Sequence, residues 1–213
     1  MEGKVSRVVV IGAHPDDFEI GAGMRIIHHI RKGDYVVGVL CTDGERGGDP
    51  QIRLKEAESS AKSLGLAKLH CFHLPDANLL DLIAVKDMLE KIIEMEKPDV
   101  VYTHFRKDTH QDHRTVSKAS SIACRRVPVI LNYKSPSTIV SEFHPHLFHV
   151  GNEEDMRKKE ETIKLFKSQL AKYNNLDLRR IKIDASYYAS TLQLGENFYA
   201  EPFFANHFIL NFD

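Results

Sequence analysis

Short apolar runs alternate along the first two thirds of the chain with longer stretches that carry apolar residues at helical spacing. The apolar runs are continuous in Val, Ile and Leu, which is typical of strands covered on both faces. We expect strands at 7–12, 34–41, 67–73, 99–103 and 127–133, and helices at 20–32, 51–64, 81–96 and 114–125. Strands that alternate with helices in this way favour right-handed crossovers and a parallel sheet.

The last third of the chain follows a looser pattern. We expect short strands and turns over 134–150, a long charged amphipathic helix over 153–173, and an added edge strand over 203–210. No repeat or linker-like tract divides the sequence, so we expect a single domain over residues 1–213. The predicted fold class is α/β: a Rossmann-like three-layer α/β/α sandwich with a mostly parallel sheet and an irregular C-terminal third.

Composition narrows the class of protein. The chain has 213 residues, of which 42% are apolar and 28% charged, as in a folded globular domain. The net charge of −1 gives no general attraction to nucleic acid or to an anionic membrane. No apolar run approaches the ~20 residues of a membrane span, and the first residues lack a signal-peptide pattern. We therefore expect a cytoplasmic protein without nucleic-acid or membrane partners.

Cysteine and histidine are used differently in this sequence. The three cysteines, Cys41, Cys71 and Cys124, lie far apart in or beside apolar runs, and we interpret them as buried thiols. Of the twelve histidines, several lie where predicted strands end. In open α/β sheets ligands bind beyond the carboxyl ends of the strands. The segments expected there are AHPDD at 13–17, TDGERGGD at 42–49, LPD at 74–76 and, shortly after His104, HQDH at 110–113.

The first of these segments predicts metal ligands. His14 and Asp17 lie three residues apart at a strand-to-helix turn, a spacing that lets both side chains face one metal ion. Asp16 points in a different direction and could hold a water that the metal activates. Aspartates at the start of a helix are also favoured as caps, so capping is the competing interpretation of this pair.

A second pair of imidazoles precedes the fourth predicted helix. Either His110 or His113 could be the third ligand of a His/Asp/His site, and Asp112 could cap the helix or orient a histidine. Three protein ligands leave positions open for water and substrate, which marks a catalytic zinc site. A structural zinc would favour cysteine, and none occurs in these loops. Iron(II) accepts the same ligands.

Two other kinds of site are excluded by motif. A dinucleotide site needs GxGxxG after the first strand, whereas this chain places Asp16 and Asp17 where they would repel a pyrophosphate. A serine hydrolase of the α/β type needs a GxSxG turn, which the sequence lacks.

The sequence resembles the PIG-L/LmbE-like deacetylases. AHPDD followed by HQDH carries the resemblance, which extends over nearly the whole chain through four further segments. These are TDGE at 42–45 with Arg53 and Glu56, LPD at 74–76, Lys167-Ser168-Gln169, and YAEPF at 199–203. Members of this family are zinc-dependent hydrolases that remove an acetyl group from N-acetylglucosamine units on varied carriers.

The resemblance implies a role for each of eight residues. His14, Asp17 and His113 would hold one Zn²⁺ per chain. Asp16 would be the general base, His110 would stabilise the oxyanion or act as an acid, and Asp112 would support His110. Arg53 and Asp76 would hold sugar hydroxyls, although they also fit a helix-surface cation and a turn residue.

The expected activity is removal of the N-acetyl group from a small-molecule N-acetylglucosamine-type conjugate, giving acetate and a free amine. The alternative is a metal-dependent amidohydrolase that acts on a different N-acylated small molecule. The segment after His113 is compact and carries no membrane anchor, which disfavours a lipid substrate. The irregular C-terminal third could serve as the interface of a homo-oligomer.

Overall fold

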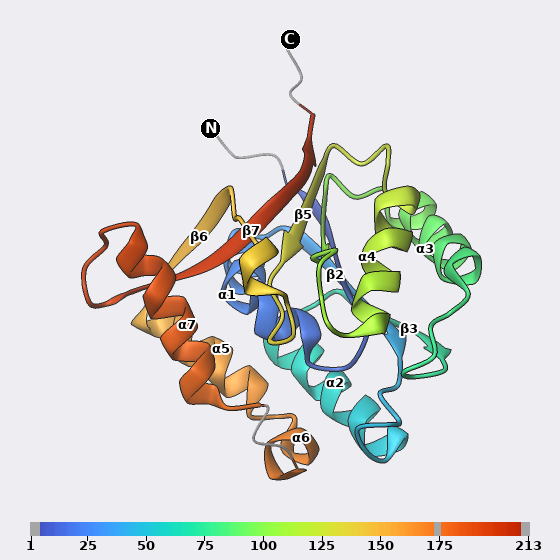
Figure 1. Cartoon of the computed structure of the whole chain (residues 1–213), viewed down its shortest axis with the longest axis horizontal. Coiled ribbons are helices and arrows are strands. Elements are labelled where there is room, and N and C mark those ends of the chain that lie inside the picture. The colour runs from blue at the N-terminus through green and yellow to red at the C-terminus, as the bar shows by residue number, and fades with distance from the viewer. Residues whose placement is uncertain (1–4, 173–175, 210–213) are drawn as a thin grey trace.

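The computed structural model of the chain describes residues 5–172 and 176–209, and it contains one seven-stranded sheet in the order β3-β2-β1-β4-β5-β7-β6 (Figure 1). The parallel strands are β1 (Arg7–Gly12), β2 (Tyr35–Thr42), β3 (Lys68–Leu74), β4 (Val100–His104) and β5 (Val129–Tyr133). β7 (Phe198–Phe208) runs antiparallel to β5 and to β6 (Leu147–Asn152). The mostly parallel α/β sheet predicted from the sequence is confirmed.

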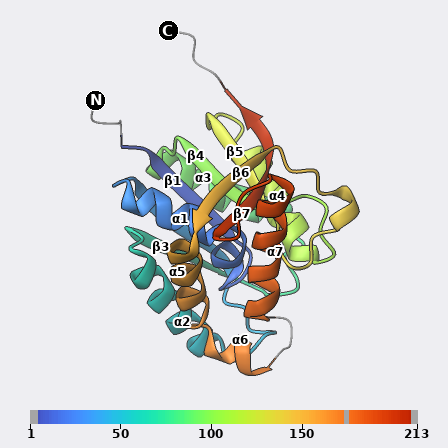
Figure 2. The same ribbon diagram turned by 90° about the vertical axis from the view of Figure 1, so that its left-hand side faces the viewer.

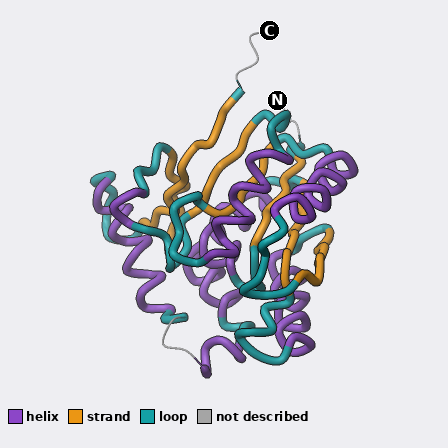
Figure 3. Tube along the Cα trace, turned by 45° about the vertical axis from the view of Figure 1, so that its right-hand side comes forward, coloured by secondary structure: helices purple, strands orange, loops and turns teal. Residues whose placement is uncertain are grey.

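Helices cover both faces of the sheet (Figures 2 and 3). One face carries α3 (Leu82–Glu96) and α4 (Gln111–Ala123). The other carries α1 (Asp17–Arg31), α2 (Pro50–Leu64) and α5 (Glu153–Ile163), with α6 (Lys167–Lys172) beside α2 and α7 (Leu178–Thr191) against β7. Val8 and Val10 pack toward the α1 side and Val9 and Ile11 toward the α3–α4 side. Burial on both faces explains the continuous apolar runs of the sequence.

The strand order places a crevice beside β1. β1 lies between β2 and β4, and the chain winds outward from it to β3 on one side and to β5 on the other. The loops that follow β1 and β4 therefore diverge to opposite faces of the sheet, which is where open α/β sheets bind ligands. These loops contain the two histidine segments singled out in the sequence.

A kink near the start of α1 is fixed by two buried charges. Ala22 departs from helical geometry with a φ of −141°, which frees backbone groups on either side of it. Glu201 of β7 accepts hydrogen bonds from the N–H of Met24 and of the next residue, each at 2.8 Å. Lys159 of α5 donates to the carbonyl of Ile20 at 2.6 Å and to Glu201 at 2.7 Å. The C-terminal part of the chain thus holds the first turns of α1 in place.

The C-terminal third differs from the sequence predictions. The single helix expected over 153–173 is two helices, α5 and α6, because the chain turns after Ile163 so that α6 reaches Glu56 of α2 through Ser168. Residue 173 lies outside the described residues. The edge strand expected over 203–210 is the second half of β7, which begins earlier, at Phe198, and runs to Phe208. Residues 204–208 pair only with β5, as expected of an edge, whereas β6 covers the outer side of 198–203. Residue 210 lies outside the described residues. α7 was not predicted.

Two smaller predictions have clear outcomes. Cys41 and Cys124 are buried as expected, whereas Cys71 is half-buried because β3 is the edge strand. Among the helices of the described part of the chain, none has the length and apolar character needed to cross a bilayer.

Candidate active site

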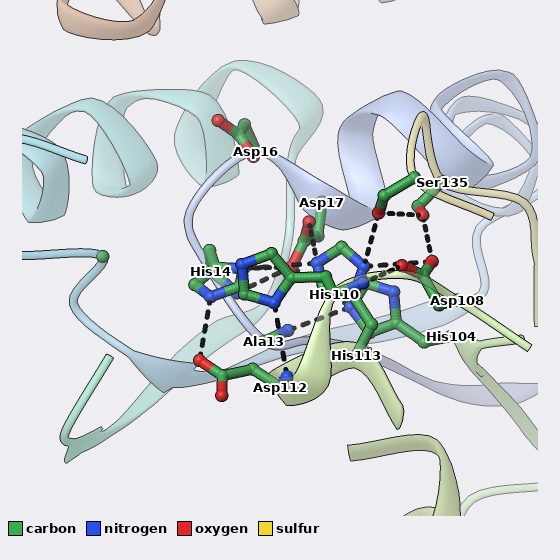
Figure 4. A network of polar contacts seen from close by, with 12 residues as sticks. Ala13, His14, Asp16, Asp17, His104, Asp108, His110, Asp112, His113 and Ser135 are labelled. Atoms are coloured by element: carbon green, nitrogen blue, oxygen red, sulfur yellow. Dashed lines mark hydrogen bonds and ion pairs between the residues drawn. The ribbon is translucent and has the colours of Figure 1, made fainter. Parts of the chain in front are cut away.

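The carboxyl ends of β1 and β4 bring the predicted histidines and aspartates into one buried cluster (Figure 4). His14 and Asp17 come from the turn between β1 and α1, and His113 comes from the first turn of α4. The turn after β1 is tightly constrained. Asp16 has a φ of 100°, in the left-handed region that costs non-glycine residues energy, and its side chain forms no cap hydrogen bond with α1. The capping interpretation of Asp16 is therefore not supported by the structure.

Three donor groups face one another at distances that suit a metal ion. The Nδ1 atom of His14 lies 3.3 Å from the Asp17 carboxylate and 3.3 Å from the Nε2 atom of His113. His113 Nε2 lies 3.4 Å from Asp17. Ligands at about 2.1 Å from a tetrahedral zinc ion are separated by about 3.4 Å. The structure thus brings together the three residues predicted as ligands, in a geometry that fits the ion.

Acidic side chains behind the two imidazoles fix which ring nitrogens face the centre. His14 Nε2 lies 3.1 Å from Asp76 and 3.3 Å from Asp112. His113 Nδ1 lies 3.2 Å from Asp108. A carboxylate accepts the N–H of each ring on the outer side, so the lone pair of the other nitrogen is directed at the centre. This arrangement of carboxylate, histidine and central point is the one found around catalytic metals.

The cluster is electrostatically built to hold positive charge. Burial opposes protonation of His113, but Asp17 and Asp108 outweigh it and raise the pKa of this imidazole to about 9. The pKa of His14 is raised well above its usual value, against burial, by Asp17 and Asp112. Burial alone would raise the pKa of Asp17, yet the neighbouring imidazoles hold it well below its usual range. A metal cation would take the place of the bound protons.

Three other overlapping sets of possible metal ligands lie in the same cluster. Metal-ligand spacing is also met by His14, His110 and His113, by Asp17, His104 and His113, and by His14, Asp76 and Asp112. His104 is already engaged, because its Nε2 atom accepts the N–H of Ala13 at 3.1 Å. Its ring stacks on His113 with centroids 3.9 Å apart, so we regard it as a support for the site.

The structure changes the expected role of Asp112. In place of the support for His110 expected from the sequence, its carboxylate contacts His14 and accepts the backbone N–H of Ala77 at 2.7 Å. His110 caps α4 instead, and its Nδ1 atom accepts the N–H of Asp112 at 3.3 Å. Burial and the neighbouring imidazoles lower the pKa of His110. A neutral ring with an occupied Nδ1 carries its proton on Nε2, which makes His110 a donor.

Asp16 is held beside the metal-ligand cluster by Arg53. One Arg53 nitrogen lies 3.3 Å from the Asp16 carboxylate and 2.8 Å from the carbonyl of Pro15, and the other donates to the carbonyl of Gly44 at 2.8 Å. Burial raises the pKa of Asp16 to about 7, against the pull of Arg53. Arg53 is only 4% exposed, so its visible role is to join two site loops.

The cluster opens into one cleft with two connected parts. The larger part, of 380 Å³, is lined by Asp16, Asp17, Ile20, His113, Pro136, Ser137, Gln169, Leu176 and Arg180. The smaller part, of 300 Å³, is lined by His14, Asp16, Arg46, Gly47, Arg53, Asp76, Ala77, His110 and Gln169. Asp16 and Gln169 line both parts, which makes the cleft continuous. All eight predicted site residues line this cleft or touch a residue that does.

Sequence reasoning did not identify several residues that build this site. Asp108 orients His113 and is itself held by the hydroxyl of Ser135. A signal for Asp108 existed, since it is an acid in the same loop as the HQDH segment. Gln169 lies in the Lys167-Ser168-Gln169 segment of the family resemblance, but no role was assigned to it. Ser137 and Arg180 come from parts of the C-terminal third where no motif marks their approach to the cleft.

The chain belongs to the PIG-L family. The family described as "PIG-L: GlcNAc-PI de-N-acetylase" matches residues 9–124, more than half of the sequence. YaiS of Escherichia coli K12, an uncharacterized deacetylase, is 39% identical over 170 residues, which cover 76% of this chain and 90% of YaiS. The diacetylchitobiose deacetylase of Thermococcus kodakarensis is 33% identical over 122 residues, which cover 52% of this chain and 46% of that protein. The family and these relatives support a metal-dependent deacetylase.

The fold itself serves more than one reaction. The crystal structure of GalB, the 4-carboxy-2-hydroxymuconate hydratase of Pseudomonas putida KT2440, superposes with a TM-score of 0.81 at 19% identity, over 97% of this chain and 98% of GalB. At this identity the likeness shows the fold alone. The reaction and the substrate must therefore be argued from the site.

Proposed function

We propose that this chain is a zinc-dependent hydrolase that removes the acetyl group from an N-acetylglucosamine-type sugar conjugate. The observation that carries the proposal is the set of three donors on His14, Asp17 and His113, each 3.3–3.4 Å from the next, with Asp16 beside them in the cleft. Membership of the PIG-L family supports the choice of deacetylation among hydrolytic reactions.

The donor set fits zinc in number and kind. Two imidazole nitrogens and one carboxylate leave at least one position for water or substrate, as in catalytic zinc sites. A bound zinc ion supplies Lewis-acid chemistry: it activates water and polarises a carbonyl group. Iron(II) would be held by the same donors, so the identity of the metal is part of the test.

The side chains around the donor set provide the proton transfers. Asp16 takes a proton from the water that attacks the acetyl carbonyl carbon, and Arg53 keeps its carboxylate in place for this step. His110 donates a hydrogen bond from Nε2 to the carbonyl oxygen as negative charge develops there. The carbon–nitrogen bond then breaks, and the proton held by Asp16 passes to the leaving nitrogen. The products are acetate and a free amine.

The cleft suits a polar substrate of sugar size. We assign Arg53 and Asp76 to the side of the cleft that holds sugar hydroxyls, because both line the smaller part with His110. A second candidate is a different N-acylated small molecule, since the three metal ligands and Asp16 would act on the amide group whatever carries it.

A panel of N-acetylglucosamine compounds tests the proposal directly. Acetate release would be measured with purified protein as prepared, after chelation, and after adding back zinc or, without oxygen, iron(II). We expect release that disappears on chelation and returns with zinc. Protein that binds one metal per chain but releases no acetate from any compound would overturn the sugar assignment in favour of another amide.

Substitution of Asp16 by Asn tests the general base. We expect the variant to keep its metal and to lose about 10²–10⁴-fold in rate, the usual contribution of a base. Asp43→Asn is the matched control, because Asp43 pairs with His73 and does not line the cleft. Activity near that of the control, with metal still bound, would remove Asp16 from this role.

A further inference from the structure

The cleft extends beyond the metal-ligand cluster toward the start of α7. Arg180 lines its larger part together with Asp17 and His113, and it also lines the adjoining hollow between α1, α7 and β7. Ile20 and Pro136 line both spaces, so the two spaces adjoin between the metal ligands and α7. A substrate whose acetamido group lies at the metal ligands could extend through the larger part of the cleft to Arg180.

Arg180 differs from the other charged residues of this region because its guanidinium forms no ion pair within the described part of the chain. The neighbouring ion pairs are Lys134 with Asp184, Lys159 with Glu201 at 2.7 Å, and Arg179 with Asp177 at 3.2 Å. Among the residues that the structure describes, none forms a hydrogen bond or an ion pair with the Arg180 guanidinium. The side chain is exposed at the wall of the cleft.

The position of Arg180 in its helix also favours a bound anion. α7 begins at Leu178, so Arg180 lies in its first turn, where the helix dipole disfavours cations and favours anions. For Arg179 this cost is offset by the capping residue Asp177, which pairs with its guanidinium. The guanidinium of Arg180 has no such pairing with a carboxylate among the described residues. An anion placed there would gain from the dipole and from the guanidinium together.

We propose that Arg180 binds an anionic group, a carboxylate or a phosphate, on the part of the sugar conjugate that lies beyond the acetamido group. The substrate class is then an acidic N-acetylglucosamine conjugate, an assignment that rests on the proposed function. Arg46, at the other end of the cleft, is the competing cation. Its end of the cleft also contains the Asp76 carboxylate, which accepts the Arg46 backbone N–H at 2.9 Å and disfavours an anion there.

Pairs of substrates that differ only in charge test this assignment. The glycolic acid glycoside of N-acetylglucosamine would be compared with its glycolamide glycoside, and N-acetylglucosamine 1-phosphate with its uncharged methyl glycoside. We expect the wild type to prefer the anionic member of a pair in kcat/KM. In Arg180→Ala the value for the anion should fall by about 10- to 100-fold, mainly through KM, since a charge-assisted contact is lost. A larger effect in the glycolic acid pair would identify the bound group as a carboxylate, and a larger effect in the 1-phosphate pair would identify it as a phosphate.

Two control variants make the outcome decisive. Arg179→Ala removes an adjacent cation that does not line the cleft and should retain the preference. Arg46→Ala should also retain most of it. The anion proposal is overturned if the wild type hydrolyses both members of each pair equally well, or if the preference disappears in Arg46→Ala and persists in Arg180→Ala. Absence of acetate release from every compound would instead overturn the proposed function.

Discussion

The two ends of the parallel strands each hold a buried group of histidine and aspartate, and the two groups are organised differently. At the carboxyl ends, His14, Asp17 and His113 surround a common point. Near the opposite ends, His29 lies between Asp34, 2.7 Å from its Nδ1 atom, and the hydroxyl of Tyr102, 2.9 Å from its Nε2 atom. Both groups are as buried as the apolar core, so burial does not distinguish them.

The arrangement of hydrogen-bond donors and acceptors does distinguish the two groups. Around His29 they alternate along a chain: Arg25 donates to the oxygen of Tyr102 at 2.8 Å, Tyr102 donates to His29, and His29 donates to Asp34. Every contact joins a donor to an acceptor. In the metal-ligand cluster three acceptors face one another, which is favourable only around a positive charge. Convergence of lone pairs, and not composition or burial, therefore identifies the reactive group.

The two groups also shift their histidines in opposite directions. Burial lowers the pKa of His29 to about 4, although Asp34 acts against it, and Arg25 adds to the lowering. The pKa of His113 is raised to about 9, because Asp17 and Asp108 outweigh its burial. One histidine is thus held neutral within a closed chain of hydrogen bonds, and the other is in a place that demands a cation.

The largest effect should follow from removing one of the three proposed metal ligands. His113→Ala should lose bound metal and reduce acetate release by more than about 10³-fold, since a catalytic metal supplies several kcal/mol to the transition state. The matched variant His29→Gln should keep one metal per chain and most of its activity. Metal content and rate, measured together with the thermal midpoint of each variant, separate loss of the site from loss of the fold. A His113→Ala protein that is folded, metal-loaded and active would refute the ligand assignment.

A smaller effect is expected on the pH dependence of the free energy of unfolding, to which His29 should contribute. His29 has a folded-state pKa of about 4, below the 6.5 of the unfolded chain. The unfolded chain therefore takes up a proton first, and stability is lost as the pH falls from about 6.5 to 4. The loss should approach about 3 kcal/mol, from ~1.4 kcal/mol per pKa unit.

The variant His29→Gln isolates this contribution. It cannot take up the proton, so its free energy of unfolding should fall less than that of the wild type over the same pH range. Urea unfolding at several pH values, with metal saturation kept constant, measures the difference. Equal slopes for the two proteins would show that His29 is not held neutral in the folded state.

The sequence predicted the parallel part of the fold, and the gathering of histidines and aspartates at the strand ends, because both depend on local signals. β1, β2, β4 and β5 are mainly continuous apolar runs, and HPDD and HQDH are short motifs at strand ends. The choice of His113 over His110 as a metal ligand came from the family resemblance. The C-terminal third was harder because its structure depends on distant partners. β7 carries no local sign that β6 will pair with its outer side, and α6 depends on the contact of Ser168 with Glu56.

The orientation of side chains within the site was also beyond the sequence. Asp112 is next to His113 in the chain, yet its carboxylate turns to His14, 98 residues away, because the start of α4 leaves it on that side. Spacing identified which residues gather at the strand ends. It could not identify which acid orients which ring.

The smallest expected effect concerns Asp108, which occupies the same position beside His113 as Asp34 does beside His29. Each aspartate accepts a hydrogen bond from the Nδ1 side of a buried histidine, Asp108 from His113 and Asp34 from His29. Asp108→Asn should weaken metal binding by about 10- to 100-fold, the usual cost of removing a residue that orients a ligand. Competition with a chelator of known affinity measures this change.

Asp34→Asn makes the same chemical change at the other end of the sheet. It should lower the free energy of unfolding and leave the metal affinity unchanged, because no metal donor contacts Asp34 among the residues described. If Asp108→Asn behaved in this way as well, Asp108 would be a structural residue. His113 would then owe its orientation to packing against His104 and to Ser137, whose hydroxyl lies 3.2 Å from its Nδ1 atom.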